Sequence, residues 1–235
     1  MYETDVQNNY CSCKAWKFQK KPNAVRDCKH LIKKRGFALP DVPGYSYKKS
    51  KPKFMLLSET VPATPIYNTE DYVFSRKYDG IRVALNTRGE LITRGGVVLS
   101  ELNMRYKPKF QLDGELCHVL EEGHVHVMKA LDDKNQYQNL VMRVFDFWPA
   151  KNQCIPYVDR YEMLLDMKSN WPKNNLKLVK QNEFHDTVSL QQQINHLLRE
   201  CVDQRLEGIV VRNKYSCYIS DGERNNETIF KAKPK

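Results

Sequence analysis

The alternation of apolar and polar positions predicts a body built mainly of short strands. "DYVFS" (71–75) is rich in β-formers, and "GIRVALN" (80–86) and "LITRG" (91–95) flank the turn "TRGE", which predicts a hairpin. "KFQLDGEL" and "HVHVMKA" predict a second hairpin with "EEG" at its turn. On that strand His124 and His126 would face the same side, which favours a solvated face over a metal site.

The second half of the body combines a buried strand, two helices and two late strands. "LVMRVFDFW" (140–148) is almost continuously apolar, as expected for a strand buried on both faces. Residues 161–167 and 190–202 have helical periodicity, and the second helix carries one apolar stripe of Leu190, Ile194, Leu197, Leu198 and Cys201. With "EGIVVR" and "TIFKAK" as late strands, the pattern predicts an α+β domain that is mostly antiparallel. The two glycine-rich phosphate-binding motifs, G-x-x-x-x-G-K-[ST] and G-x-G-x-x-G, are absent.

Charge is distributed unevenly along the 235 residues. Residues 1–53 hold 13 Lys and Arg against 4 Asp and Glu, whereas the remaining 182 residues hold 25 against 24. A basic excess confined to one end favours a polyanionic partner, with nucleic acid as the leading candidate, over a merely solubilising tail.

The N-terminal segment carries a candidate zinc site. Cys11, Cys13, Cys28 and His30 follow the pattern C-x-C-x14-C-x-H, and two close pairs of such ligands can close a tetrahedral zinc site. A segment this short and rich in lysine has little core of its own, so the metal would supply the folding energy. The order of the ligands resembles the SWIM zinc finger, a small module associated with nucleic-acid and protein binding; the alternative is a disordered arm.

These observations predict three parts: a zinc module over residues 1–46, a basic linker over 47–53 and a larger domain over 54–235, which is long enough to form a core of its own. No apolar run is long enough to span a membrane, and no signal-peptide core is present. We therefore expect an intracellular, reducing compartment, nuclear or cytoplasmic, and a monomer. The other cysteines, Cys117, Cys154, Cys201 and Cys217, show no paired spacing and are interpreted as unpaired thiols.

Short polar clusters recur where the predicted strands end. In order they are Lys77-Tyr-Asp79-Gly80-Ile-Arg82, Thr93-Arg94-Gly95, Asp113-Gly114-Glu115, Phe145-Asp146-Phe147, Glu207-Gly208-Ile-Val-Val and Lys231-Ala-Lys233. One such cluster alone is typical of a turn, but six in this order resemble the covalent nucleotidyltransferases, which comprise ATP-dependent DNA ligases, RNA ligases and mRNA capping enzymes. The resemblance runs from about Phe54 to the last residue. It implies a nucleotidyltransferase (ATP-grasp-like ligase adenylation) fold.

The chemistry of that family explains the residue types. A lysine amine attacks the α-phosphorus of a nucleotide, and it must first lose its proton, which nearby cations favour. The resemblance implies that Lys77 is this nucleophile and that Asp79 supports the site. It further implies that Arg82 and Glu115 hold the ribose and phosphate region, that Glu207 places Mg2+, and that Lys231 and Lys233 grip the α-phosphate.

For three aromatic or cationic residues the sequence leaves a second interpretation open. The resemblance implies that Phe145 stacks on the purine, although Phe145 would equally suit a core position. Arg94 would contact the nucleic-acid end that is joined, or lie on a surface turn. Arg224 matches an arginine that precedes the last motif in many DNA ligases, or is a solvated loop residue.

Within the superfamily, the motifs favour a DNA ligase that uses ATP. K-x-D-G-x-R with Arg82, followed by (S/T)-R-x-G with Arg94, is the DNA-ligase form, whereas RNA ligases often carry a smaller residue at position 82. The implied substrate is nicked double-stranded DNA with 3′-hydroxyl and 5′-phosphate ends, and the zinc module could also dock a protein. The alternatives are an RNA ligase and a non-catalytic zinc-containing nucleic-acid binder.

The sequence departs from the DNA-ligase pattern at two places. The chain stops two residues after Lys233, where DNA ligases continue into an OB-fold domain, so we expect that domain to be truncated or naturally missing. Ser75 stands two residues before Lys77, where larger DNA ligases have a glutamate, and we expect it to line the adenine site.

Overall fold

The computed structural model describes residues 3–8, 10–13, 28–35, 52, 54–58, 69–102, 104–149, 154–172, 174–185, 188–219 and 224–234. The chain divides into two compact units, residues 1–48 and 49–235, which are described separately. The predicted domain boundaries at residues 46 and 53 lie outside the described residues.

The first unit consists of a short hairpin and one helix. Strand β1 (Thr4–Asp5) pairs antiparallel with β2 (Tyr10–Cys11), and helix α2 spans Lys29–Arg35. Its buried cluster consists of Leu31 and the cysteines at positions 11, 13 and 28. Among the residues of this unit that the structure describes, three of the four buried side chains are therefore thiols, and the described apolar core is small.

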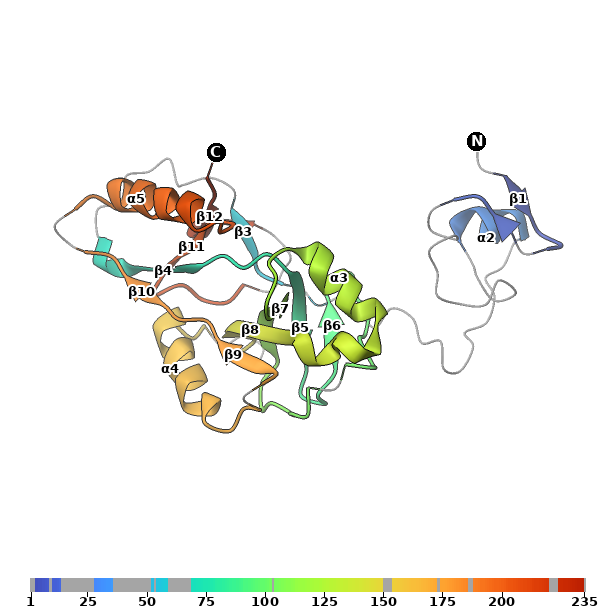
Figure 1. Ribbon diagram of the computed structural model, residues 1–235, viewed down its shortest axis with the longest axis horizontal. Helices are drawn as coiled ribbons and strands as arrows, with labels where there is room; N and C mark the ends of the chain where they lie inside the picture. The colour runs from blue at the N-terminus through green and yellow to red at the C-terminus, as the bar shows by residue number, and fades with distance from the viewer. Residues whose placement is uncertain are drawn as a thin grey trace. The chain divides into compact units, whose positions relative to one another are not determined.

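The second unit contains two five-stranded sheets (Figure 1). The first has the order β10-β4-β11-β12-β3. In chain order its strands are β3 (Leu56–Ser58), β4 (Tyr72–Arg76), β10 (Asn182–Glu183), β11 (Ile209–Asn213) and β12 (Arg224–Ala232). Neighbours pair antiparallel except β12 and β3, which are parallel.

The second sheet has the order β6-β5-β7-β8-β9. Its strands are β5 (Ile81–Leu85), β6 (Leu91–Thr93), β7 (Leu112–His118), β8 (Leu140–Phe147) and β9 (Leu176–Leu178). Only β8 and β9 are parallel. The predicted hairpin of residues 80–95 is confirmed as β5 and β6, and the almost continuously apolar β8 is largely buried. The expected α+β, mostly antiparallel class is thus confirmed.

Helices cover both sheets. Helix α5 (Leu190–Asp203) packs its apolar stripe against β11 and β12, with Ile194 and Cys201 buried beside Val211 and Phe230. Helix α3 (His124–Asp132) packs on β7, and α4 (Tyr157–Lys168) packs on β8 and β9. Short 3-10 turns span Thr69–Asp71 (η2) and Lys134–Asn139 (η3). The larger core lies between the second sheet and helices α3 and α4.

The prediction of a strand at residues 124–130 is wrong, because the structure has helix α3 there. The alternation His-Val-His-Val mimics a strand, but Val127 and Ala130 are the buried positions and follow a helical spacing. His124 and His126 consequently do not share a strand face.

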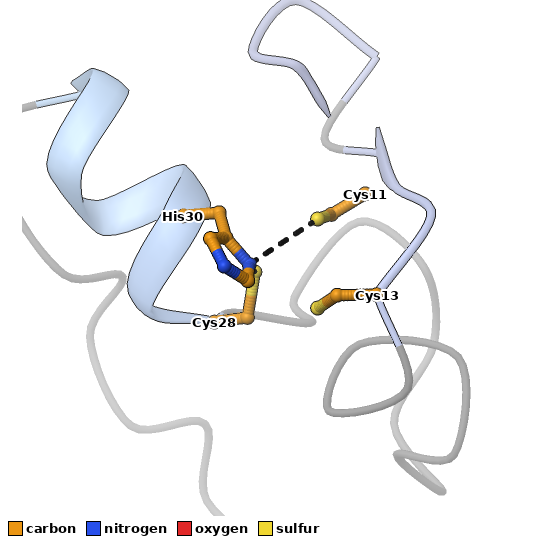
Figure 2. A group of neighbouring side chains, drawn as sticks. All are labelled: Cys11, Cys13, Cys28 and His30. Carbon is orange, nitrogen blue, oxygen red and sulfur yellow. Dashed lines mark hydrogen bonds between the residues drawn. The ribbon is translucent and has the colours of Figure 1, made fainter. Parts of the chain in front are cut away.

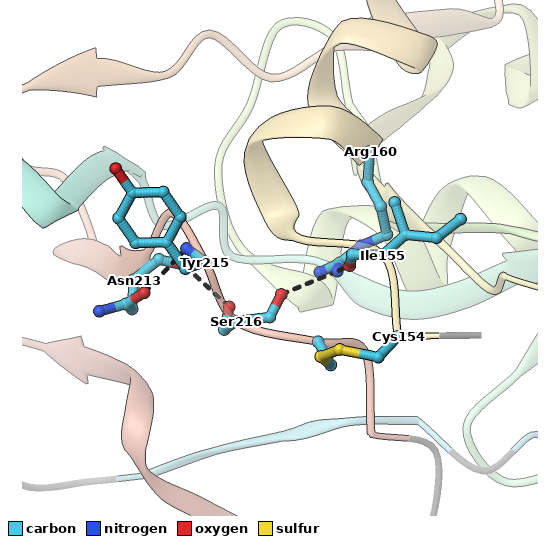
Figure 3. Close-up of a disulfide and its surroundings, with 7 residues drawn as sticks. Cys154, Ile155, Arg160, Asn213, Tyr215 and Ser216 are labelled. Carbon is cyan, nitrogen blue, oxygen red and sulfur yellow. Dashed lines mark hydrogen bonds between the residues drawn. A yellow bond between two sulfur atoms is a disulfide. The ribbon is translucent and has the colours of Figure 1, made fainter. Parts of the chain in front are cut away.

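The interpretation of Cys154 and Cys217 as unpaired thiols is also wrong. The structure joins them in a disulfide whose Cα atoms lie 5.0 Å apart (Figure 3). Their separation of 63 residues gives no spacing pattern, since only the packing of two loops brings them together. Cys117 and Cys201 are free and buried, as expected. Among the described residues, no helix is long and apolar enough to cross a membrane.

Candidate functional sites

Lys77 lies where the chain crosses from the first sheet to the second. It follows β4 directly, and Gly80 precedes β5. A Cβ at Gly80 would lie 2.2 Å from the Leu116 carbonyl oxygen, so only glycine allows β5 to approach β7 this closely. The Asp-Gly pair is therefore part of a tight crossing that fixes the lysine.

Glu207 joins two lysines that are distant in the sequence. Its Oε2 lies 2.5 Å from Lys77 Nζ, and its Oε1 lies 2.6 Å from Lys233 Nζ. Burial opposes ionisation of Glu207, but the hydrogen bonds from Lys233 and Lys77 hold its pKa below the ordinary value. The backbone supports this arrangement, because the Lys77 amide donates to the Gly208 carbonyl at 2.8 Å.

Arg82 is clamped by a carboxylate and by two aromatic rings. Its Nε and Nη2 donate to Asp113 at 3.0 and 2.7 Å. The guanidinium carbon lies 4.9 Å from the centre of the Phe54 ring and 5.2 Å from that of Phe145. Bidentate pairing combined with stacking fixes the plane of the guanidinium.

A pocket between the two sheets gathers five of the predicted site residues. Ser75, Lys77, Arg82, Glu115 and Phe145 all line it. The first sheet also contributes Leu57, Arg76, Val210 and Arg212, and Tyr78 and Val179 complete the lining. The pocket thus has a charged side next to Lys77 and an apolar side suited to a planar base.

Glu115, a carboxyl group in the pocket lining, has a raised pKa. Burial raises its pKa from 4.5 to about 7, although Arg82 and Lys77 act in the opposite direction. Near neutral pH this group therefore exists in both forms. Its position on β7, directly across from Arg82 on β5, places the two side chains on one face of the sheet.

The structure separates Phe145 from the core residue next to it in the same motif. Phe147 is fully buried and stacks on Phe110 at a centroid distance of 5.1 Å. Phe145 is half-buried and lines the pocket. Ser75 is 5% exposed and pairs in register with Val210, so both side chains face the pocket from neighbouring strands.

A buried ionic network that the sequence interpretation did not identify lies behind the pocket. Asp146 accepts from Arg160 at 2.8 and 3.1 Å and also pairs with Arg212, which lines the pocket. Although burial opposes ionisation, Arg160 and Arg212 keep the pKa of Asp146 below its ordinary value. Asp146 and Arg212 belong to recognisable motifs, whereas Arg160 has no sequence pattern that would have identified it.

Other predicted site residues lie outside the pocket lining. Asp79 is half-exposed, 4.0 Å from His124 Nδ1, and lines a neighbouring cavity with Arg76 and Tyr78. Arg94 is exposed in the turn after β6. Lys231 lines a groove beside α5 together with Lys233. Arg224 begins β12, and its side chain lies outside the part of the chain that the structure describes.

In the first unit, Cys11, Cys13, Cys28 and His30 converge on one point (Figure 2). The four candidate ligand atoms lie within 4.8 Å of one another, and the three cysteines are buried. His30 Nδ1 lies 3.8 Å from Cys11 Sγ and 3.9 Å from Cys28 Sγ. A tetrahedral zinc site with Zn–S bonds near 2.3 Å has ligand–ligand edges of about 3.8 Å, so this donor set fits zinc.

Comparisons with known proteins agree with the fold. The family described as ATP dependent DNA ligase domain matches residues 55–233, whereas no curated protein matches the chain. The fold is similar to that of Lig E DNA ligases, a minimal DNA-binding scaffold, with a TM-score of 0.61 and 21% identity over 77% of this chain and 68% of that one.

Two further solved structures share the fold. Chlorella virus DNA ligase-adenylate is similar with a TM-score of 0.58 and 16% identity, over 78% of this chain and 69% of that one. Mycobacterial DNA ligase D complexed with ATP is similar with a TM-score of 0.55 and 18% identity, over 77% of this chain and 60% of that one. This chain therefore spans about two thirds of the length of these three ligase structures.

Proposed function

The chain belongs to the ATP-dependent DNA ligase domain family, and from this premise we propose that it seals nicks in double-stranded DNA through a covalent lysyl-AMP intermediate. Lys77 Nζ would attack the α-phosphorus of ATP and release pyrophosphate. The AMP would then pass to the 5′-phosphate of the nick. Attack by the 3′-hydroxyl on this DNA-adenylate would close the strand and release AMP. Such a reaction serves DNA repair and replication.

The arrangement of Lys77, Glu207 and Lys233 carries the proposal. Glu207 holds Lys77 beside a pocket, and a second amine lies on the other oxygen of the same carboxylate. When a triphosphate enters, its negative charge competes with Glu207 for the two lysines. Lys233 would then stabilise the α-phosphate while Lys77 attacks it. Lys231, near the end of β12 and two residues before Lys233, would add a second cation.

The rest of the pocket suits the remaining parts of ATP. Phe145 and Ser75 both line the pocket, and the Phe145 ring would stack on the adenine. Glu115, when ionised, would accept hydrogen bonds from the ribose hydroxyls, and Arg82 would hold the phosphate side. We propose that Arg94 and Arg224 contact the DNA end, that Asp79 supports the crossing after Lys77, and that the protein acts as a monomer.

Mg2+ would be held at Glu207, because a carboxylate beside the phosphate position is the type of ligand this ion prefers. When bound, Mg2+ supplies neutralisation of the charge that develops on the triphosphate. The residues of the chain keep their own roles around it: they orient Lys77, stack the base and hold the ribose.

We further propose that the first unit is a SWIM-type zinc module that grips DNA. The Cys and His donor set fits zinc, and zinc binding would add to the small apolar core that the described residues form around Leu31. The basic excess of residues 1–53 supplies the charge for phosphate contacts. Docking of a protein partner is the alternative role of the module.

Incubation with labelled ATP tests the proposal against a non-catalytic binder, because only an active site forms a covalent adduct. Nicked DNA and nicked RNA duplexes, compared at equal salt, then separate a DNA ligase from an RNA ligase. We expect the lysyl-AMP adduct and sealing of nicked DNA. A protein that forms no adduct, or that seals only RNA, contradicts the proposal.

A further inference from the structure

The disulfide Cys154–Cys217 joins two loops whose carbonyl groups accept hydrogen bonds from Arg160, behind the pocket. Figure 3 shows Arg160 between the carbonyl groups of Ile155 and Ser216, which adjoin the two cysteines. Tyr218 directly follows Cys217 in the chain, so the disulfide also fixes the backbone next to Tyr218. Neither the resemblance nor the proposed mechanism gives these residues a role.

Tyr218 is linked to Arg82 through one carboxylate oxygen. Its hydroxyl donates to Asp113 Oδ2 at 2.7 Å, and the same oxygen accepts from Arg82 Nη2 at 2.7 Å. Asp113 is fully buried and Tyr218 is 8% exposed, so little water can replace this hydrogen bond. We call this hydrogen-bonded chain of Tyr218, Asp113 and Arg82 the Tyr218 relay.

The surroundings hold the tyrosine ring in place. Trp148 packs against it at a centroid distance of 5.0 Å, and Phe54 packs on Trp148 at 5.2 Å. The Met55 amide donates to the Tyr218 hydroxyl at 3.4 Å. The hydroxyl therefore connects the segment before β3, strand β7 and the loop after β11.

The relay affects the charge as well as the position of Asp113. Burial raises the pKa of Asp113, whereas the hydrogen bonds from Arg82 and Tyr218 favour its ionised form. Only the ionised carboxylate accepts both hydrogen bonds of the Arg82 fork. Loss of the Tyr218 hydroxyl would thus loosen Arg82 without removing any group that touches the nucleotide.

We propose that Tyr218 is a positioning residue that fixes Arg82 for nucleotide binding through Asp113, and that the Cys154–Cys217 disulfide fixes the segment carrying Tyr218. The inference rests on the proposed function, because Arg82 needs a fixed position only if the pocket takes a nucleotide. Arg82 acts on bound ATP before the chemical step, so the relay should affect the KM for ATP more than kcat.

The test compares Tyr218→Phe with Tyr215→Phe, which removes the same hydroxyl from an exposed ring in the same loop. In self-adenylation we expect Tyr218→Phe to raise the KM for ATP roughly tenfold, the factor that about 1.4 kcal/mol produces. Its kcat should change much less, and Tyr215→Phe should match the wild type. A purely structural role would instead lower the active fraction, and so the apparent kcat, at an unchanged KM; that result overturns the inference.

The double variant Cys154→Ser/Cys217→Ser tests the second part, alone and combined with Tyr218→Phe. Assays are run below the unfolding temperature of every variant, because losing the crosslink also lowers stability. We expect the serine variant to raise the KM in the same direction, and by a smaller factor when Tyr218 is already Phe. An unchanged KM, or equal factors in both backgrounds, overturns the anchoring by the disulfide. A wild type that forms no adduct would refute the proposed function itself, which distinguishes the two failures.

Discussion

Replacing Glu115 with glutamine should change how the stability of the protein depends on pH. Burial raises the pKa of Glu115 from 4.5 to about 7 in the folded protein, so the folded state binds this proton more tightly than the unfolded state does. As pH rises from about 5 to 8, the wild type must ionise a half-buried carboxyl group, and this costs folding free energy. Glutamine has no proton to lose, so the variant avoids that cost.

The size of the effect follows from the two pKa values. One pKa unit corresponds to about 1.4 kcal/mol, so the difference between 4.5 and about 7 corresponds to about 3.5 kcal/mol. We expect the free energy of unfolding of Glu115→Gln, relative to the wild type, to increase by most of that amount, about 2.5 kcal/mol, between pH 5 and pH 8. At acidic pH, where both side chains are neutral, the two proteins should differ least.

Urea unfolding at half-unit pH steps measures this difference directly. Glu162→Gln, a substitution at an exposed position on α4, serves as the control and should follow the wild type at every pH. If the curves of the wild type and Glu115→Gln run parallel from pH 5 to 8, the carboxyl group is not held in a desolvating pocket. The placement of Glu115 on the ribose side of the pocket would then be wrong.

Three further outcomes are expected. Cys28→Ser should lose its bound zinc, as measured by atomic absorption, and should bind DNA more weakly. Deletion of residues 1–48 should flatten the slope of log DNA affinity against log salt concentration by about three units if the unit contacts three phosphates. Equal slopes for all of these proteins would exclude DNA binding by the first unit. Gly208→Ala should lose about 2–4 kcal/mol of unfolding free energy, because φ is 139° and the new Cβ would lie 2.2 Å from the Ala232 carbonyl oxygen; wild-type stability would contradict this. Phe145→Ala should raise the KM for ATP with little loss of stability, whereas Phe147→Ala should lower the free energy of unfolding by about 3–5 kcal/mol. A large loss of stability in Phe145→Ala, together with a raised KM in Phe147→Ala, would contradict the assignment of Phe145 to the pocket and Phe147 to the core.

The motifs could be predicted from the sequence because each is local. Lys77, Asp79 and Gly80 fall within one short run, and the patterns of residues 71–75 and 80–86 place that run between two strands. The order of the motifs also assigned Lys77 and Glu207, 130 residues apart, to one site through a resemblance, whereas their direct contact is seen only in the structure. Periodicity failed at α3, where His-Val-His-Val alternates as a strand does and a helix forms instead.

What lies behind the pocket could not be predicted, because no residue type there indicates its partner. Tyr218 and Asp113 are 105 residues apart, and Arg212 and Asp146 are 66 apart. Their pairing depends on how the two sheets and the loops after β8 and β11 pack. The same holds for Cys154 and Cys217, whose loops meet only in the folded chain.

Mapping of the AMP adduct by mass spectrometry tests the central claim most directly. The protein is incubated with ATP and Mg2+, digested, and compared with Lys77→Arg, which keeps the positive charge beside Glu207. Lys214→Arg is the matched control, because Lys214 also pairs with a glutamate, Glu183, at 2.9 Å but lies outside the pocket lining. We predict AMP on the peptide that contains Lys77 in the wild type and in Lys214→Arg, and none in Lys77→Arg. AMP on any other lysine, or an adduct that survives Lys77→Arg, would contradict the account.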